Sequence, residues 1–338
     1  MRKRMLSYAN RAAIYNLYLY LASYVAPADG DTLQSVTTAL QAAQAAGKWN
    51  SRDHLRLRVL SSAVEAGVVP SDAKISDQSR SKNGLNATVF TEPSGAIFVA
   101  FRGTADGEWL DNGKGLSGIS ETNVYSTYGV VRGDFATDQQ VEALNWFHRI
   151  AVRNGWDELT DITVSGHSKG GNKAQFVALH SLLVSRGFSF DGQGFSPEAI
   201  SAFQTRFGDT YADRIRRIYS ISADNDYVNV LGNRLMPLAN VVYLESARGL
   251  HYLEAMLDEN GWFRPQTTQG ELSKYIEMIS REVMSLPPSL RQIVTIGLMN
   301  IFQQYIAQEP PVGADNMQTA QRIANLAVGI TPLLQGVR

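Results

Sequence analysis

Apolar residues follow helical spacing in the first part of the chain and β-like runs in the next part. Up to about residue 84 they recur at helical intervals between polar turns, as at Ile14, Leu17 and Leu21. From residue 87, short β-rich runs alternate with helical stretches, which predicts an α/β fold with a mainly parallel sheet. The predicted strands cover residues 87–91, 96–101, 161–165, 188–191, 217–222 and 241–245, and the predicted crossover helices cover residues 137–152 and 172–185.

These changes of pattern divide the chain into three regions. Residues 1–84 are predicted to form an N-terminal helical cap, and residues 85–264 an α/β core. Residues 265–338 are predicted to form a C-terminal helical extension packed on that core. The apolar stretch at 290–306 has few basic neighbours, so we expect it to pack on the domain rather than to bind a membrane.

The N-terminus combines basic residues with a following apolar stretch, an arrangement shared with secretory signals. Basic residues at positions 2–4 precede the apolar residues 12–25, and small residues follow at 26–28. Asn10, Arg11 and Asn16 argue against a secretory signal, and an amphipathic core helix explains the apolar positions without a cleavage site. No stretch has the length and purity of a transmembrane helix. We therefore expect a protein that is cytoplasmic at synthesis, with secretion by a non-classical route left open.

Composition excludes several kinds of chemistry. The chain has 338 residues, of which 44% are hydrophobic, and a formal net charge of -1. This size supports a substantial core, and the balanced charge provides no field that would favour nucleic acid as a partner. There are no cysteines, which excludes disulfides, thiolate metal sites and a cysteine nucleophile. The sequence implies no metal or organic cofactor.

The strongest chemical signal is Val-Ser-Gly-His-Ser-Lys-Gly-Gly-Asn at residues 164–172. It contains G-x-S-x-G after a predicted strand and before a predicted helix, which is the context of a nucleophile elbow. Gly166 and Gly170 avoid collisions in such a strained turn, and Ser168 is then the nucleophile. The amide of Lys169, near the helix N-terminus, can face a developing oxyanion. The motif predicts a serine hydrolase of the α/β-hydrolase fold, flanked by helical segments at both ends.

A serine nucleophile needs a general base, and histidine is the side chain whose pKa suits that role. Among the five histidines, His54 and His148 lie on predicted helices before the elbow. His167 should point away from its serine neighbour, and His180 lies too far along the following helix. His251 follows the last predicted strand, where the chain order serine, acid, histidine of α/β-hydrolases places the base.

The acid of the site should lie between Ser168 and His251, after a strand. The segment after the strand at 217–222 offers both Asp224 and Asp226, and spacing alone does not choose between them. Asp191 is a third candidate, because it ends the strand that follows the elbow helix.

Four short motifs lie along the predicted core. They are Phe-Arg-Gly-Thr at 101–104, Gly-His-Ser-Lys-Gly-Gly-Asn at 166–172, Phe-Asp-Gly-Gln-Gly-Phe at 190–195 and Asp-Tyr-Val at 226–228. Together they resemble the class 3 lipases, and most closely their bacterial relatives of the Mbeg1-like family, over residues 87–262. The resemblance implies that Asp226, in its Asp-x-Val context, is the triad acid. It implies that Asp191 belongs to a strand and the loop after it, and that it is not the triad acid. It also implies that Thr104, after Phe-Arg-Gly, supplies the second oxyanion amide.

The chain departs from the class 3 pattern directly after the serine. Class 3 lipases carry a leucine or similar residue there, whereas this chain has Lys169, as the Mbeg1-like relatives do. The resemblance therefore transfers the mechanism better than the substrate. Residues 105–132 are glycine-rich, include Trp109, Leu110 and Tyr125, and occupy the region where lipases hold a lid. A lid and an ordinary surface loop both fit this composition.

These features predict hydrolysis of carboxylic esters, above all lipid esters as in a lipase or phospholipase, through an acyl-serine intermediate. A lipid substrate would imply transient contact with a membrane surface. The alternatives are a small-ester carboxylesterase or thioesterase, a secreted antibacterial lipase effector with an immunity protein as partner, and a catalytically silent binding module on the same fold. A misplaced His251 would favour the silent module.

Overall fold

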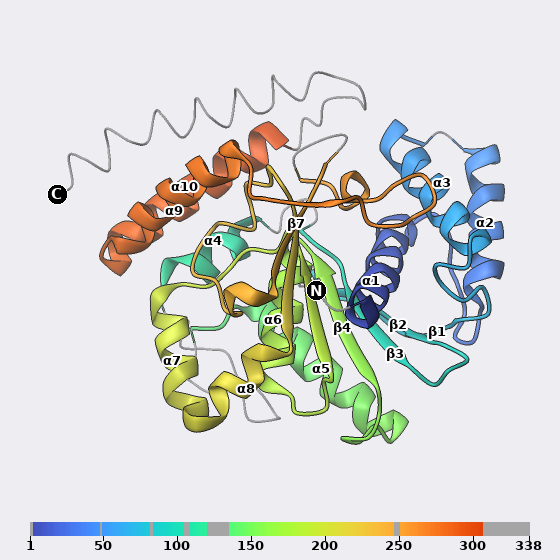
Figure 1. The fold of residues 1–338 in the computed structure, drawn as a ribbon, viewed down its shortest axis with the longest axis horizontal. Coiled ribbons are helices and arrows are strands. Elements are labelled where there is room, and N and C mark those ends of the chain that lie inside the picture. The colour runs from blue at the N-terminus through green and yellow to red at the C-terminus, as the bar shows by residue number, and fades with distance from the viewer. Residues whose placement is uncertain are drawn as a thin grey trace.

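A mixed sheet with helices on both faces forms the centre of the molecule (Figure 1). The computed structural model describes residues 3–47, 49–81, 84–104, 109–119, 135–246 and 251–306, with side chains described for residues 4–299 of these ranges. Within them the strands lie side by side in chain order. They are β1 (Lys74–Arg80), β2 (Asn86–Thr91), β3 (Ile97–Phe101), β4 (Ile162–His167), β5 (Arg186–Phe190), β6 (Ile218–Ala223), β7 (Val241–Leu244) and β8 (Gln266–Thr267).

The sheet is mainly parallel, as the alternation of strands and helices predicts. Strands β3 to β7 are parallel to one another, whereas β1, β2 and β3 pair antiparallel and β8 is antiparallel to β7. Each predicted strand is present within one or two residues of its expected bounds. Because these strands are parallel, the loops after β4, β6 and β7 all lie at the carboxyl ends of the strands, on the same side of the sheet.

The prediction that residues 1–84 are helical throughout is wrong for β1. This strand has the sequence Lys-Ile-Ser-Asp-Gln-Ser-Arg and an irregular register opposite β2 between Ser76 and Ser79. Polar residues dominate it because it lies at the edge of the sheet, so no apolar alternation marks it in the sequence. The expected domain boundary after residue 84 therefore falls between two paired strands of one sheet.

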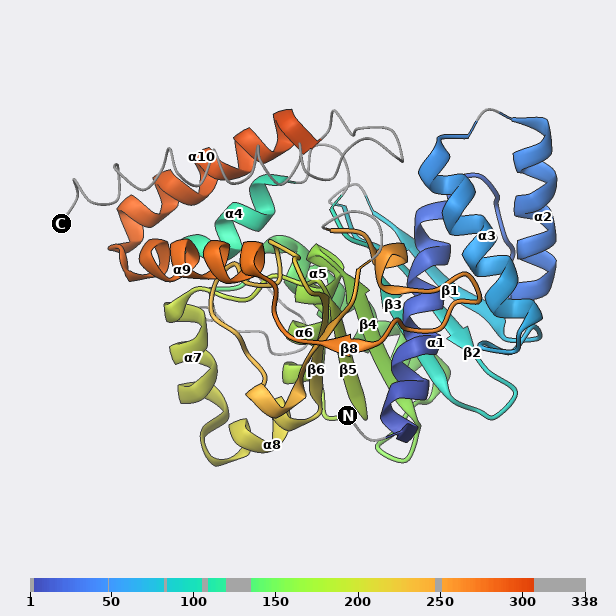
Figure 2. The same cartoon turned by 45° about the horizontal axis from the view of Figure 1, so that its top comes forward.

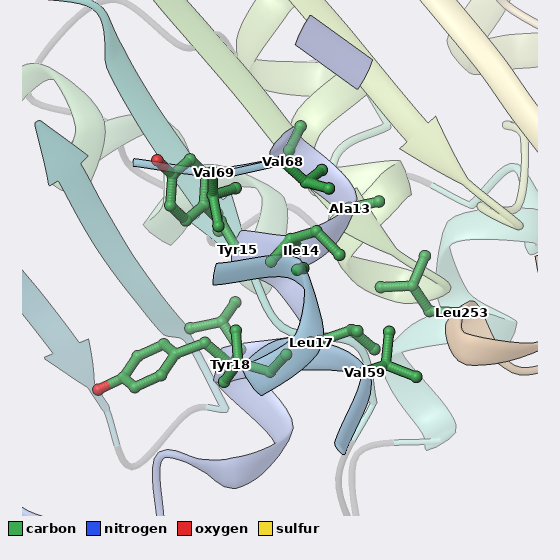
Figure 3. Close-up of a cluster of buried hydrophobic side chains, with 14 of the residues drawn as sticks. Ala13, Ile14, Tyr15, Leu17, Tyr18, Val59, Val68, Val69 and Leu253 are labelled. Carbon is green, nitrogen blue, oxygen red and sulfur yellow. The ribbon is translucent and has the colours of Figure 1, made fainter. Parts of the chain in front are cut away.

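The first helix covers one face of the sheet. Helix α1 (Lys3–Leu21) packs on β3 and β4, with α2 (Leu33–Ala46) and α3 (Ser51–Glu65) outside it (Figure 1). Ile14, Leu17 and Tyr18 are fully buried, and the ring of Tyr15 stacks on Phe90 of β2 with centroids 4.3 Å apart. Figure 3 shows these side chains meeting residues from α3 and from the segment after it. The expected amphipathic core helix is confirmed.

The opposite face of the sheet is covered by α5 (Asp138–Asn154) and α6 (Lys169–His180). Trp146 and Phe147 of α5 and Phe176 of α6 are buried there against β2, β3 and β4. Helix α5 begins with a capping box in which Thr137 and Gln140 satisfy each other's backbone amides. Helices α7 (Pro197–Phe207) and α8 (Tyr211–Arg216) continue this layer. Both crossover helices that the sequence predicts are present.

Two C-terminal helices and one internal helix form a further layer at the top of the molecule. Figure 2 shows α4 (Trp109–Ser117) beneath α10 (Pro288–Ile306), with α9 (Glu271–Ser285) beside them. A side chain at Gly113 would lie 3.2 Å from Met299, and the Thr295 hydroxyl donates to the Gly113 carbonyl at 3.2 Å. Helix α10 therefore packs on the domain, as expected from its sequence, whereas residues 307–338 of the predicted C-terminal extension lie outside the described residues. Among the described helices, none is long and apolar enough to cross a membrane.

We predict that Leu17→Ala lowers the free energy of unfolding by about 2–5 kcal/mol, because it leaves a cavity between α1 and the sheet. Leu159→Ala removes the same atoms from a side chain that is 93% exposed and should have little effect. Urea unfolding followed by circular dichroism measures both values. Equal losses in the two variants would contradict the placement of α1 in the core.

Candidate active site

Ser168 stands at the sharp turn between β4 and α6. Its φ of 58° and ψ of -126° lie outside the regions that residues with a side chain usually adopt. A Cβ at Gly166 would lie 2.1 Å from the carbonyl carbon and oxygen of Gly170, and a Cβ at Gly170 would lie 2.0 Å from the carbonyl oxygen of Phe101. Neither position has room for a side chain. This explains why the turn needs glycine on both sides of the serine.

Ser168 is joined by hydrogen bonds to two of the other predicted site residues. Its Oγ lies 2.9 Å from Nε2 of His251, and Nδ1 of His251 lies 2.5 Å from Oδ2 of Asp226. The three residues come from the segments that follow β4, β6 and β7. Asp226 is fully buried, and the His251 side chain is 11% exposed. In this arrangement a proton on Nδ1 faces the carboxylate, and Nε2 can accept the serine proton.

Backbone amides hold the Asp226 carboxylate in this position. Its Oδ1 accepts hydrogen bonds from the amides of Val228 at 2.9 Å and Asn229 at 2.6 Å. These two bonds orient the carboxylate, and its second oxygen faces His251.

The two other candidate acids stabilise the surrounding backbone instead. Asp224 Oδ1 accepts from the hydroxyl of Ser246 at 2.7 Å and from the amide of Asn225 at 3.0 Å. Asp191 has a positive φ of 47° and accepts from the amide of Ala223 at 2.9 Å. Asp224 thus closes the turn after β6, and Asp191 connects the ends of β5 and β6.

Three of the remaining histidines lie away from the serine, as expected. His54 is exposed on α3, with Nδ1 2.6 Å from the Gln44 amide nitrogen. His148 belongs to α5, and Nδ1 of His180 lies 2.9 Å from the carbonyl oxygen of Phe176 within α6.

The prediction that His167 points away from the site is wrong. Its ring centroid lies 4.9 Å from that of His251, and its Nδ1 lies 2.6 Å from the hydroxyl of Tyr20 in α1. Ser165 stands two residues earlier and accepts a hydrogen bond from Asn16, one helical turn before Tyr20. The alternation of β4 therefore directs both side chains toward α1. The residue before the serine consequently ends beside the triad.

Burial alters the charge of two groups next to the triad. It raises the pKa of the Asp191 carboxyl well above its usual range, and the nearby charge of Asp226 adds to this effect. Burial also lowers the pKa of the His167 imidazole well below its usual value, with smaller contributions from His251 and Arg56. Both shifts favour the neutral forms of these side chains.

A buried ion pair connects the residue after the serine to α4. Nζ of Lys169 lies 2.5 Å from Oδ2 of Asp111, which also accepts from the Thr137 hydroxyl at 2.9 Å. Burial alone would raise the pKa of Asp111. The charge of Lys169 and the hydrogen bonds from Lys169 and Thr137 outweigh burial, so the pKa lies below its usual value. The pair holds α4 against the elbow.

The backbone stretches expected to supply oxyanion donors lie on either side of the serine. Lys169 is the first residue of α6, where amides have no partner within the helix. Thr104 follows Gly103, at which a Cβ would lie 2.9 Å from the carbonyl oxygen of His167 and 3.2 Å from Cβ of Ser168. The Thr104 segment therefore runs directly against the elbow.

A narrow pocket adjoins Ser168 beneath α4 and α10. The centre of a water molecule can occupy about 10 Å³ there, which is room for about one water. Of the region expected to hold a lid, the described residues at 109–117 form α4, which contributes Trp109 and Asn112 to this pocket, whereas residues 105–108 and 120–134 lie outside the described residues. The pocket is lined by Trp109, Asn112, Ser168, Gln193, Tyr227, Val228, Leu231 and Met299.

Sequence reasoning did not identify Tyr20 and Asp111 as neighbours of the site. They lie 147 and 58 residues away in sequence from the residues that they bind, so no local motif includes both partners. A weak signal exists for each. Asn16 and Tyr20 place polar groups one turn apart in an apolar helix, and a lysine inside a tight elbow needs a carboxylate when it is buried.

We predict that Asp111→Asn lowers the free energy of unfolding by about 3–5 kcal/mol, because Lys169 is left as a buried charge without its counterion. The lowered pKa of Asp111 means that the native pair stabilises the fold above the unfolded-state pKa. This stabilisation is lost as the pH falls through the lower folded-state value. The difference in the free energy of unfolding between wild type and Asp111→Asn should therefore become smaller at acidic pH.

Urea unfolding at neutral and acidic pH measures this effect. Asp213→Asn is the control, because Asp213 forms an ion pair with Arg216 in which both side chains are more than two thirds exposed. Such pairs contribute little to stability. A loss at Asp111 no larger than at Asp213 would contradict the account of the buried pair.

Comparison with known proteins identifies the family that the core resembles. The model of the Mbeg1-like family matches residues 72–223, a span that includes Ser168 but neither Asp226 nor His251. No curated protein sequence matches the chain.

Several solved structures are similar to this one at low sequence identity. The N225Q mutant form of MDLA from Penicillium cyclopium is 15% identical, with 73% of this chain and 83% of that chain covered and a TM-score of 0.42. A fungal lipase is 11% identical, with coverage of 81% and 91% and a TM-score of 0.45. A triacylglycerol lipase from Penicillium expansum is 11% identical, with coverage of 66% and 93% and a TM-score of 0.36. The family match confirms, over residues 72–223, the resemblance to the Mbeg1-like family that the sequence motifs predict.

Proposed function

We propose that this protein hydrolyses carboxylic esters with Ser168 as nucleophile, His251 as general base and Asp226 as the acid that orients the histidine. The observation that carries the proposal is the continuous hydrogen-bonded chain from Ser168 Oγ through both ring nitrogens of His251 to Asp226. The strained elbow adds to it, because it presents the serine hydroxyl at the end of the sheet where both partners meet.

The reaction follows from this geometry. Nε2 of His251 accepts the serine proton while Oγ attacks the ester carbonyl, and the amides of Thr104 and Lys169 stabilise the oxyanion. The imidazolium then gives its proton to the leaving alcohol, which leaves an acyl group on Ser168. A water molecule, deprotonated by His251, attacks the acyl-enzyme and releases the acid. Asp226 keeps the Nδ1 proton of the imidazole in place and stabilises its charged form.

The walls of the pocket favour an ester with an apolar acyl chain. Trp109, Val228, Leu231 and Met299 contribute apolar surface close to Ser168. In the present arrangement the pocket holds about one water molecule, so its walls would have to move apart to admit an acyl chain.

Exposed apolar side chains on these same helices support a lipid ester as the substrate. Leu110 of α4 is 44% exposed, and Leu290 and Ile293 of α10 are 36% and 69% exposed. Contact of these residues with a lipid surface would stabilise an open arrangement and bring the site close to its substrate. A small soluble ester would need no such surface, so the dependence of the rate on lipid aggregates separates the two substrates.

We predict that the purified protein hydrolyses p-nitrophenyl esters, with higher kcat/KM for longer acyl chains, and that Ser168→Ala abolishes the reaction while leaving the circular dichroism spectrum unchanged. Alanine fits the elbow but lacks the atom that forms the acyl bond. Activity on only the shortest esters would contradict a lipid ester as the substrate and favour a small ester instead. Full activity in the alanine variant would overturn the proposal.

Asp226→Asn should lower kcat by up to about 10⁴-fold, because asparagine presents the wrong histidine tautomer to the serine. Asp224→Asn is the matched control. Among the described contacts, the Asp224 side chain accepts hydrogen bonds from the Ser246 hydroxyl and the Asn225 amide, and an asparagine oxygen can also accept both. Steady-state kinetics on one ester compare the two variants. A larger loss of kcat in Asp224→Asn than in Asp226→Asn would show that Asp224, and not Asp226, is the acid.

A further inference from the structure

A second group of side chains meets directly beside the triad. Nε2 of His167 lies 3.6 Å from Oδ2 of Asp191. One ring nitrogen of His251 completes the group, and the three candidate ligand atoms lie within 4.8 Å of one another. The group combines two imidazoles and one carboxylate, contributed by the ends of β4 and β5 and by the segment after β7.

Two of these atoms are buried without a hydrogen-bond partner among the described residues. They are Nε2 of His167 and Oδ2 of Asp191, in side chains of residues that are 5% and 0% exposed. Their separation of 3.6 Å is too long for a hydrogen bond. Buried polar atoms normally have partners, because leaving them unsatisfied costs free energy. A ligand bound between them would satisfy both atoms.

We propose that His167, Asp191 and His251 bind a zinc ion, and that this ion inhibits ester hydrolysis. Both ring nitrogens of His251 are engaged in the triad, toward Ser168 and Asp226. A metal ion that takes either nitrogen removes one of these two hydrogen bonds, so the histidine no longer serves as base. The ion is thus an inhibitor rather than a cofactor. The inhibitory part of this inference rests on the proposed function, whereas the binding site does not.

The donor set and its spacing fit zinc. Two imidazole nitrogens and one carboxylate oxygen are a common zinc ligand set, whereas magnesium and calcium prefer oxygen ligands alone. Ligands about 2.0–2.2 Å from a tetrahedral zinc ion lie about 3.3–3.6 Å from one another. The separation of 3.6 Å between His167 and Asp191 is close to this value. To serve as the third ligand, His251 would have to give up its hydrogen bond to Ser168 or to Asp226, and a water molecule would take the fourth position.

Tyr20 orients the His167 ring for such a site. The tyrosine oxygen lies 2.6 Å from Nδ1, the nitrogen that faces away from Asp191. Metal-bound histidines usually donate the proton of their second ring nitrogen to an acceptor. With a metal ion on Nε2, Nδ1 of His167 would carry the proton and donate it to the Tyr20 oxygen. The guanidinium of Arg56 lies 4.2 Å above the Tyr20 ring, which keeps the ring in place.

Zinc binding can be measured independently of catalysis in the Ser168→Ala protein. After treatment with EDTA and removal of the chelator, zinc chloride is titrated by isothermal calorimetry, and the melting temperature is followed in parallel. We expect binding of one ion and a melting temperature that rises with zinc concentration. Magnesium chloride should produce neither effect.

Variants show whether the ion occupies the proposed site. Added to the Ser168→Ala background, Asp191→Asn and His167→Gln should each abolish the calorimetric signal, and Tyr20→Phe should weaken the affinity by about 10- to 100-fold. His54→Asn is the control, because His54 is an exposed histidine on α3 and its replacement should leave the affinity unchanged. If Asp191→Asn does not fold, the His167→Gln variant tests whether the ion occupies the proposed site.

The activity arm uses the protein with its native serine. Zinc should inhibit ester hydrolysis, EDTA should restore it, and inhibition should be lost in His167→Gln relative to that variant's own zinc-free rate. Absence of binding, or binding that survives both ligand variants, would overturn the inference. One-site binding that the ligand variants abolish, in a protein without hydrolytic activity, would retain the zinc site and remove the proposed function instead.

Discussion

The backbone of Ser168 changes from strand to helix within one residue, and the absence of side chains at Gly166 and Gly170 makes this turn possible. A Cβ at either glycine would lie within about 2.1 Å of backbone atoms, those of the elbow itself or of β3. The elbow is therefore pressed against the end of the neighbouring strand. This contact fixes the serine at the carboxyl edge of the sheet, where the loops after β6 and β7 bring Asp226 and His251 to it.

The two residues that flank the serine connect it to different helical layers. His167 contacts Tyr20 of α1, and Lys169 pairs with Asp111 of α4. Both contacts are polar and largely buried, so each is costly to break and specifies one arrangement of its layer. The N-terminal helix and the helix above the pocket are thus both coupled to the elbow.

The sequence predicts those elements whose formation depends mainly on residues close together in the chain. The elbow, the parallel strands and the crossover helices follow from G-x-S-x-G and from apolar periodicity. Strand β1 could not be predicted, because an edge strand with mostly polar residues has no such periodicity. Spacing did not separate Asp224 from Asp226, since both lie in one loop and their hydrogen bonds decide their roles. The orientation of His167 and the Asp111–Lys169 pair depend on residues distant in sequence, so only the folded structure shows them.

The central claim is that Ser168 is the residue that becomes acylated, and covalent labelling tests it most directly. A fluorophosphonate probe reacts with an activated serine and leaves a stable phosphonyl group on its oxygen. Digestion and mass spectrometry of the labelled protein should place the group on the peptide that contains Ser168 and on no other, and prior replacement of His251 by alanine should strongly reduce labelling. A label on a different serine, or labelling of Ser168 that is unaffected by loss of His251, would contradict the account.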